Sequence, residues 1–371
     1  MTKWQHIMAS IQVQTQKGFS KSKVFIGLLG SVALSLCIGA CKGTPSETPS
    51  PANNTANGAN PDAPEPGIAY VSPPAYGMER YFGFFAGSMD SVGTGNAPDA
   101  GPGKPNPDYI PELSQVSNII HIDSGNLEAK LVECEQYNVK AIVSVSRYFF
   151  DGNFALLPEA TYRQNFDQIV PIIQRHRATV VAFYGLDEAY TNGMSKGQSE
   201  SEVKLNQETM GAYVKSWFND VPLAVIFAVP EVEQHRPLFN NFDWFGVDCY
   251  NRNMVTSEGV SVLSLIQTLK DEKDKLSNID HKPRYLISVP NVGFPSSQGM
   301  GGGTKGVLAD MPVYQNIIRD QMDADTIMVM PFLWQSFDNG RDNWIGAREV
   351  PAIVDMVKTF YINFIANSFP K

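Results

Sequence analysis

Eight short runs rich in β-branched and aromatic residues alternate with stretches of helical length, and this alternation restricts the fold more than any other feature of the chain. The runs cover residues 81–87, 118–123, 140–146, 179–185, 222–229, 243–250, 284–289 and 326–334. Apolar residues at three- and four-residue spacing predict helices over residues 126–137, 160–176, 200–218, 262–276, 313–321 and 350–365, with a kink at Pro171. Strands that alternate with helices form parallel sheets with right-handed crossovers.

Eight such units in about 290 residues predict a single (β/α)8 barrel, the TIM-barrel fold, rather than an open doubly wound sheet. No G-x-G-x-x-G sequence opens a helix after an early strand, which counts against a dinucleotide-binding domain. We therefore expect three segments: a signal over residues 1–40, a linker over residues 41–68, and the barrel over residues 69–371.

The first 40 residues have the composition of an export signal. Lysines 17, 21 and 23 precede the apolar run 24–40, which is shorter than the roughly 20 residues of a membrane-spanning helix. The run ends in IGAC and resembles the bacterial lipobox, which implies that Cys41 becomes a lipidated N-terminus; the alternatives are an ordinary secretory signal and an uncleaved anchor. The absence of Asp after this cysteine implies, by the same resemblance, an outer-membrane or other extracytoplasmic location. Residues 42–67 are rich in Pro, Asn, Thr and Ala and predict a disordered tether.

Charge and cysteine content exclude some partners of the folded domain. Without residues 1–40, which hold four of the 29 basic residues and no acid, the chain carries 25 basic and 38 acidic residues, a net charge of −13. This balance counts against nucleic acid and against anionic lipid surfaces as ligands. Only Cys134 and Cys249 remain for the folded part, without metal-binding spacing, and we expect both to be buried thiols.

The residues at the ends of the predicted strands are the candidates for function, because barrel enzymes place their chemistry there. They are Ser88, Asp90, His121, Asp123, Arg147, Tyr148, Asp187, Glu188, Glu231, Asp248, Tyr250, Asn291, Trp334, Gln335 and Asp338.

The adjacent acids Asp187 and Glu188 follow the fourth strand. Because successive residues of a strand point to opposite faces, we expect one of them to face the barrel axis. Acids that share one pocket raise each other's pKa, as a general acid requires. The alternative is that these acids cap a helix or are solvated in a loop.

Three motifs together resemble the (β/α)8-barrel glycoside hydrolases: the acid pair after the fourth strand, GVDCY at the sixth and PFLWQSF at the eighth. In the large retaining clan of these enzymes the fourth strand ends in Asn-Glu. The resemblance implies that Glu188 is the proton donor and that Asp187 replaces the Asn that contacts the sugar 2-hydroxyl.

The second carboxylate is not at the place that this resemblance implies, because the seventh strand, RYLISVPNVGFP, ends without an acid. The partner would be Asp248, Asp123 or Glu231. We favour Asp248, since Trp244, Gly246, Asp248 and Tyr250 share one strand face, although it could equally hydrogen-bond neighbouring loops. Chitinase-like barrels manage with one fourth-strand Glu and the substrate's acetamido group, but the D-x-D-x-E spacing of their motif is missing.

Several residues are expected to contact substrate. Trp334 is predicted to form the floor on which a sugar ring stacks, and the alternative is a place in the buried core. The other predicted substrate contacts are Tyr250, Tyr184, Tyr148, Arg147, Asp123, His121, Gln335 and Asn291. We expect His121 to lie in the barrel interior rather than to bind metal, and the glycine-rich run 296–306 to be a lid, a phosphate-binding loop or a loop without a role.

Three functional hypotheses follow. The first is an exported lipoprotein that hydrolyses a glycosidic bond with carboxylate acid/base catalysis by Glu188, Asp187 and Asp248. The second is a non-catalytic carbohydrate-binding lipoprotein on a degenerate barrel. The third is a metal-assisted hydrolase that uses Asp123, His121 and Asp248. In the first two cases we expect a monomer without cofactor or metal, held at the membrane only by its lipid.

Overall fold

The computed structural model describes residues 79–85, 87, 109–123, 125–248, 261–296, 303–322, 324–338 and 343–366. The predicted signal, Cys41 and the linker lie outside these residues. The candidates Ser88, Asp90 and Tyr250, as well as Cys249 and most of the glycine-rich run, also lie outside them.

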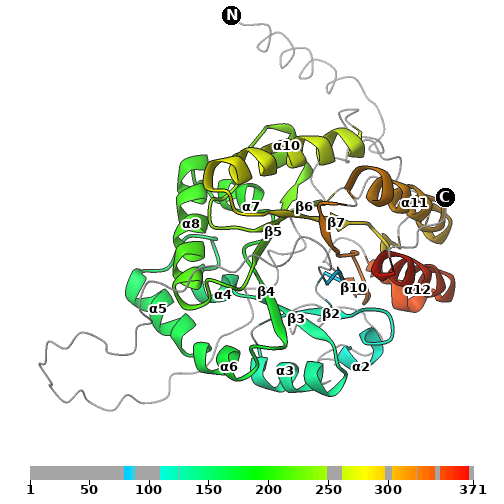
Figure 1. Ribbon diagram of the computed structural model, residues 1–371, viewed down its shortest axis with the longest axis horizontal. Helices are drawn as coiled ribbons and strands as arrows, with labels where there is room; N and C mark the ends of the chain where they lie inside the picture. Colours follow the sequence, from blue (N-terminus) through cyan, green and yellow to red (C-terminus); the bar gives the residue numbers. More distant parts are fainter. Residues whose placement is uncertain are drawn as a thin grey trace, which may run out of the picture.

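Eight parallel strands form one sheet in the order β1-β9-β7-β6-β5-β4-β3-β2. They are β1 (Tyr81–Phe82), β2 (Ile119–Ile122), β3 (Lys140–Ser144), β4 (Val180–Tyr184), β5 (Leu223–Ala228), β6 (Trp244–Asp248), β7 (Tyr285–Val289) and β9 (Thr326–Val329). Figure 1 shows the strands at the centre and the helices around them. The predicted (β/α)8 barrel is confirmed.

The helices lie outside the strands. They are α2 (Ile110–Leu113), α3 (Leu127–Gln136), α4 (Ser146–Phe149), α5 (Glu159–Asp167), α6 (Val170–Arg175), α7 (Ala189–Ser195), α8 (Glu200–Trp217), α9 (Val229–Glu233), α10 (Val262–Asp280), α11 (Gly303–Ile317) and α12 (Pro351–Ile365). The π-turn η1 (Ile318–Met322) extends α11, and the 3-10 turn η2 (Ala347–Glu349) precedes α12.

Helix boundaries depart from the predictions where short-range signals were weak or misleading. The predicted helix 160–176 is broken into α5 and α6, because Pro171 sits in the first turn of α6 and starts a new helix there. Helix α11 begins at Gly303, ten residues earlier than predicted and inside the glycine-rich run that we had assigned to a loop. The short helices α2, α4, α7 and α9 were not predicted.

Asn118 closes the barrel between the first and second strands. Its backbone N–H donates to the carbonyl of Phe82 (3.0 Å), while its side-chain amide accepts from the Phe82 N–H (2.7 Å) and donates to the Arg80 carbonyl (2.8 Å). Gly83 permits this approach, because a Cβ atom there would lie 2.0 Å from the carbonyl oxygen of Ile119. The short β1 is therefore joined to the sheet on both sides.

Alternate residues of each strand form two separate cores. In β4, Ala182 and Tyr184 pack inside the barrel, whereas Phe183 packs outward against the helices. The outer layer contains the aromatic pair Phe166 and Phe183, with ring centroids 6.4 Å apart. This period of two fixes which residues at the strand ends face the barrel axis.

Helix α8 shows how the sequence fixes an element of the outer layer. The Ser199 hydroxyl accepts from the N–H of Glu202, and the Glu202 carboxylate accepts from the N–H of Ser199 (2.7 Å), which forms a capping box. Val203, Met210 and Val214 recur at helical spacing and are buried against the barrel. The helix therefore packs one apolar face on the strands.

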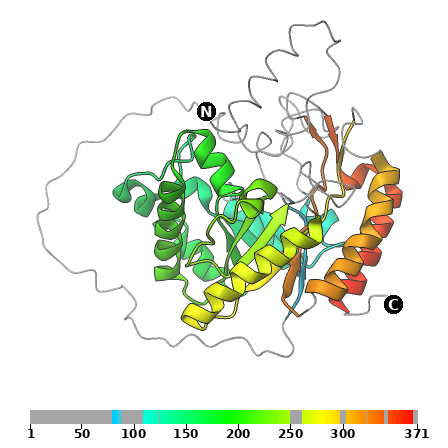
Figure 2. The same ribbon diagram turned by 90° about the horizontal axis from the view of Figure 1, so that it is seen from above.

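A small antiparallel sheet lies beyond the carboxyl ends of β7 and β9. It consists of β8 (Phe294–Pro295), β10 (Phe337–Asp338) and β11 (Asn343–Ile345), in the order β10-β11-β8. Figure 2 shows it standing above one side of the barrel. Trp344 of β11 packs against Phe332 with ring centroids 5.5 Å apart, so this sheet covers part of the catalytic end expected of the fold.

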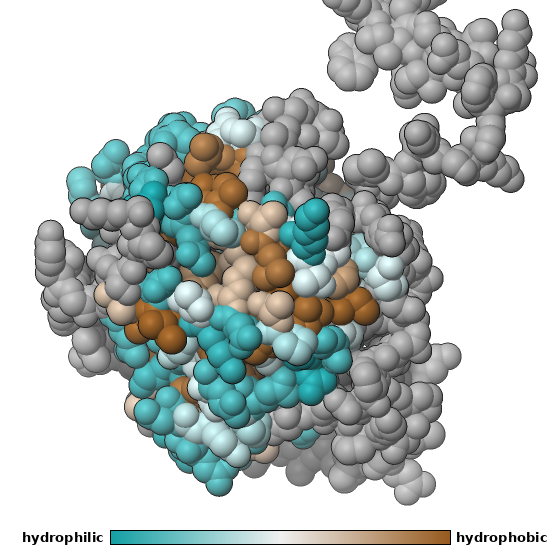
Figure 3. Space-filling model, turned by 90° about the vertical axis from the view of Figure 1, so that its right-hand side faces the viewer, coloured by the Kyte–Doolittle hydropathy of each residue, from teal (hydrophilic) through white to brown (hydrophobic). Residues whose placement is uncertain are grey.

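The surface formed by α11 and α12 carries apolar side chains among polar ones (Figure 3). Val313 of α11 is 40% exposed, and Ile362 and Ile365 of α12 are 60% and 38% exposed. Isolated apolar residues of this kind are common on protein surfaces. Among the described residues, no helix is both long enough and apolar enough to span a bilayer.

Candidate active site

Glu188 occupies a strained backbone position just beyond β4. It is the residue before the first turn of α7, with φ 45° and ψ 49°, in the left-handed region that disfavours residues other than glycine by about 1–2 kcal/mol. Its side chain makes no capping hydrogen bond to α7 and is only 4% exposed. The two alternatives from the sequence, a helix cap and a solvated loop acid, are therefore both wrong for Glu188.

Glu231 caps α7 instead. Its carboxylate accepts from the backbone N–H of Thr191 (2.6 Å), in the first turn of α7, and from that of Ala228 (2.9 Å) at the end of β5. Glu231 is 3% exposed, and burial raises its pKa to about 7 although these hydrogen bonds act in the opposite direction. Because the Glu231 carboxylate accepts the hydrogen bond from the first turn of α7, the Glu188 carboxyl is available for another contact.

That contact is with Asp248. Asp248 ends β6 on the same inward face as Trp244, as the sequence predicted, and is 6% exposed. The carboxyls of Glu188 and Asp248 share a hydrogen bond. Burial raises the pKa of Glu188 well above its ordinary value, and the charges of Asp248 and Asp187 add to this effect. Burial and the neighbouring acids thus favour the protonated form of Glu188.

Asp187 lies beside this pair but is held by other groups. The Tyr184 hydroxyl donates to its carboxylate, and the side-chain amide of Asn192 donates to its backbone carbonyl (2.7 Å). Burial raises the pKa of Asp187 to about 7, with the Tyr184 hydrogen bond acting in the opposite direction. Both acids come after the last residue of β4, so the strand alternation we expected does not govern them; the turn brings them to one site.

An aromatic wall adjoins the acids. The rings of His121 and Tyr184 have centroids 4.8 Å apart, and Phe85 lies 5.2 Å from His121 and 6.2 Å from Phe332. His121 is buried in the barrel interior, and burial lowers its pKa to about 3, so it is neutral at physiological pH. The sequence analysis did not identify Phe85 or Phe332 as site residues. The period-two pattern of their strands could have indicated that both side chains face the barrel interior.

Asp123 does not join the acid cluster as a free carboxylate. Its Oδ1 lies 2.5 Å from Nζ of Lys130 on α3, and both residues are at least 90% buried. Among the described residues, no group of three or more His, Cys, Asp or Glu side chains could hold a metal ion. The metal-assisted hypothesis, which joined Asp123, His121 and Asp248, therefore has no geometric support in this part of the chain.

Three predicted substrate contacts lie away from the acids. Trp334 is 2% exposed and packs in the outer core against Phe84, with centroids 4.8 Å apart, so it does not present the open indole face that we expected. Tyr148 packs against Phe166 in the outer layer at 6.3 Å. Arg147 is exposed on α4.

Two more predicted contacts are buried near the strand ends. Gln335 is 2% exposed and Asn291 is 5% exposed. Asn291 follows β7 and forms an isolated parallel bridge with Phe332. Of the predicted site residues that the structure describes, Glu188, Asp187, Asp248, Tyr184 and His121 form one cluster.

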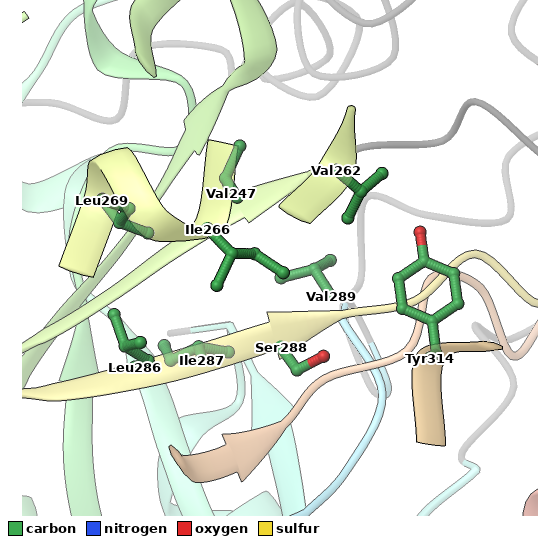
Figure 4. A pocket seen from close by; sticks show the side chains of 9 residues that line it. All are labelled: Val247, Val262, Ile266, Leu269, Leu286, Ile287, Ser288, Val289 and Tyr314. Atoms are coloured by element: carbon green, nitrogen blue, oxygen red, sulfur yellow. The ribbon is translucent and has the colours of Figure 1, made fainter. Parts of the chain in front are cut away.

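A separate cavity lies between the barrel wall and helices α10 and α11 (Figure 4). It is lined mainly by aliphatic residues of β6, β7 and α10, with Tyr314 of α11 at one end. Its volume of about 10 Å³ is close to the limit for a single water molecule. It is therefore a packing gap and not a substrate site.

Comparison with known proteins does not assign the chain to a family. No family model and no curated protein sequence matches the chain. Among solved structures, it is similar to a calcium-binding mutant of Bacteroides uniformis β-glucuronidase 2, with 12% identity over 73% of this chain and 32% of that chain (TM-score 0.48). This chain thus spans about a third of that enzyme.

Two further similarities cover most of the other chain. One is to the catalytic domain of the family 26 endo-β-1,4-mannanase of Bacillus sp. JAMB-750, with 14% identity over 78% of this chain and 88% of that chain (TM-score 0.45). The other is to a family 5 mannosidase of Rhizomucor miehei, with 8% identity over 78% and 94% of the two chains (TM-score 0.49). Similarities at this level do not assign a family or an activity to the chain.

Proposed function

We propose that this protein hydrolyses a glycosidic bond, with Glu188 as general acid and Asp248 as its partner carboxylate. The observation that carries the proposal is the buried, hydrogen-bonded pair that these two side chains form at the carboxyl ends of the strands. Glu188 has a strained backbone and does not cap α7, because Glu231 does so. Both observations support a functional role for Glu188 rather than a stabilising one.

The contact between the two carboxyls favours a retaining mechanism. Retaining enzymes hold their carboxyl groups about 5–5.5 Å apart and inverting enzymes about 6.5–9.5 Å apart. Carboxyls that are close enough to share a hydrogen bond are nearer to the first arrangement than to the second. Entry of a sugar between the two carboxyls would break their hydrogen bond and leave the proton on Glu188.

The reaction then has two steps. Asp248 attacks the anomeric carbon while Glu188 transfers its proton to the glycosidic oxygen, so that the aglycone leaves as an alcohol and a glycosyl ester forms on Asp248. The Glu188 carboxylate next takes a proton from water, whose oxygen attacks the anomeric carbon and releases Asp248. The Tyr184 hydroxyl, which donates to Asp187, orients that acid beside the bound sugar.

The test is a screen of the full chain against neutral and acidic polysaccharides, with release of reducing ends as the readout. We expect Glu188→Gln to reduce turnover by roughly 10²–10⁴-fold, the usual contribution of a general acid, while glycan binding is retained. NMR of the first product should show the anomeric configuration of the substrate. Turnover by Glu188→Gln at the wild-type rate would rule out the acid role.

A non-catalytic carbohydrate-binding function is the second candidate. The specific observation in its favour is that β7 is followed by the neutral Asn291 and not by an acid, so the site lacks a carboxylate at one position where related barrels carry it. In that case wild type and Glu188→Gln would bind the same glycans with equal affinity, and neither would release reducing ends.

We further propose that the protein is an exported lipoprotein, held at the cell envelope through Cys41 and residues 42–68. The IGAC sequence after the apolar run 24–40 supports this location. Metabolic labelling with palmitate should modify the wild type and leave Cys41→Ser unlabelled. Equal labelling of both would refute the assignment of the lipid to Cys41.

A further inference from the structure

Among the described residues, the side-chain amide of Asn291 is buried without a polar partner. Asn291 is 5% exposed, and neither its Oδ1 nor its Nδ2 has a hydrogen-bond partner anywhere in the part of the chain that the structure describes. A buried amide is normally hydrogen-bonded, and an exception of this kind calls for a physical reason. A group that binds ligand is one such reason, because the ligand would supply the missing partners.

Strand register places this amide on the inward face of the barrel. The parallel pairing of β7 with β9 joins Ile287 to Met328 and continues, in the same register, to the bridge between Asn291 and Phe332. Ile287 and Phe332 both belong to the barrel-interior core. Because Asn291 is four residues from Ile287 along an extended chain, its side chain points to the same face.

The same register relates Asn291 to the carboxyl pair. Asp248 of β6 pairs with Val289 of β7, so Asn291 lies two residues farther along the neighbouring strand, roughly 7 Å nearer the open end. Phe332 stands beside it and contacts Trp344 with centroids 5.5 Å apart. The amide is thus next to an aromatic surface and one layer above the reacting carboxyls.

We propose that Asn291 is a specificity-determining residue that binds two adjacent hydroxyls of a neutral pyranose; this inference rests on the proposed function of the site. A carboxamide presents one acceptor and one donor side by side, and two neighbouring sugar hydroxyls can supply the complementary donor and acceptor. An anionic sugar would instead meet the carboxyls of Asp187, Glu188 and Asp248, while the buried Lys130 is already paired with Asp123.

The experiment measures binding in the Glu188→Gln background, so that no ligand is consumed. Calorimetry on the full chain would use neutral oligosaccharides of glucose, mannose, galactose and xylose, and the matching uronic-acid compounds. Asn291→Leu removes both polar atoms and keeps a side chain that branches at Cγ. The control is Gln207→Leu, because Gln207 is 1% exposed on α8 with an unpartnered Oε1, yet lies in the helix layer.

We expect both leucine variants to unfold at a higher temperature than their parent, because each loses buried polar atoms that lack a hydrogen-bond partner: both amide atoms of Asn291 and the Oε1 of Gln207. Only Asn291→Leu should weaken binding of the neutral ligand, by about tenfold or more for two lost hydrogen bonds. Analogues that lack one hydroxyl should identify the pair, since they lose affinity for the parent but not for Asn291→Leu.

The outcomes separate this inference from the proposed function. If Asn291→Leu weakens binding but the wild type hydrolyses nothing, the hydrolase proposal fails and the inference stands. If the wild type hydrolyses a glycan that Asn291→Leu binds undiminished, the inference fails and the hydrolase proposal stands. Equal or tighter binding of the uronic-acid ligands, or binding of no neutral glycan, would also overturn the inference.

Discussion

Replacing Asp187 by Asn should make the protein more stable at pH 8 and leave its stability near pH 4 unchanged. Burial raises the pKa of Asp187 from 3.8 to about 7. When folding raises the pKa of a carboxyl, the protein loses stability as the pH rises from the unfolded pKa to the folded pKa, because only the unfolded chain ionises freely in that range. Asn keeps an oxygen to accept from the Tyr184 hydroxyl but does not titrate.

The size of the expected stability gain follows from the pKa shift of Asp187. A pKa change from 3.8 to about 7 is roughly three units, and at about 1.4 kcal/mol per unit it amounts to at most about 4 kcal/mol at pH 8. For a barrel of this size that is roughly 8 °C in Tm. Burial lowers the pKa of His121 to about 3, so its effect is to make stability rise with pH up to about pH 6.5. This effect is the same in both proteins and cancels in the comparison.

Urea unfolding followed by circular dichroism between pH 4 and pH 8 would measure the difference. The matched control is Asp167→Asn, because Asp167 also accepts from a tyrosine hydroxyl, that of Tyr213 at 2.7 Å, but is exposed. It should show no pH-dependent gain. A constant difference between wild type and Asp187→Asn across this range would mean that Asp187 is solvated, and the acid cluster as described would be wrong.

Three further predictions follow from other contacts. Gly83→Ala should destabilise the barrel by more than about 3 kcal/mol, since its Cβ would lie 2.0 Å from the carbonyl oxygen of Ile119 and overpacking alone costs 1–3 kcal/mol; an unchanged urea midpoint would contradict this. Lys130→Met should cost about 3–5 kcal/mol by removing the ammonium group that pairs with the buried carboxylate of Asp123, and the double variant with Asp123→Asn should recover part of the loss in the same assay. If the proposed hydrolysis is found, the alkaline limb of the pH profile of kcat/KM should move to lower pH in Asp187→Asn. The reason is that this variant lacks one negative charge that raises the pKa of Glu188. An unmoved limb would show that Asp187 does not affect the pKa of Glu188.

The barrel could be predicted from the sequence because its signals are periodic and redundant. Each strand combines apolar residues with alternating inward and outward positions, as Ala182 and Phe183 show, and eight such units leave few other folds. The position of Asp248 on the inward face of β6 followed from the same period of two.

The contacts of individual side chains depend on geometry that periodicity does not report. The expected role of Trp334 assumed that the strand continued to it, but β9 ends at Val329 and the side chain enters the outer core. Likewise, no spacing rule indicates that Glu231 caps α7 from α9, and this long-range contact is what leaves Glu188 to meet Asp248.

The most direct test of the Glu188–Asp248 pair compares two leaving groups. A general acid is needed for a poor leaving group and is dispensable for a good one, whereas a nucleophile is needed for both. Once a substrate is known, Glu188→Gln should lose roughly 10²–10⁴-fold on the natural glycan and retain near wild-type kcat/KM on the dinitrophenyl glycoside. Asp248→Asn should lose activity on both substrates. Equal loss by Glu188→Gln on the two substrates, or full activity of Asp248→Asn on either, would contradict the roles proposed for this pair.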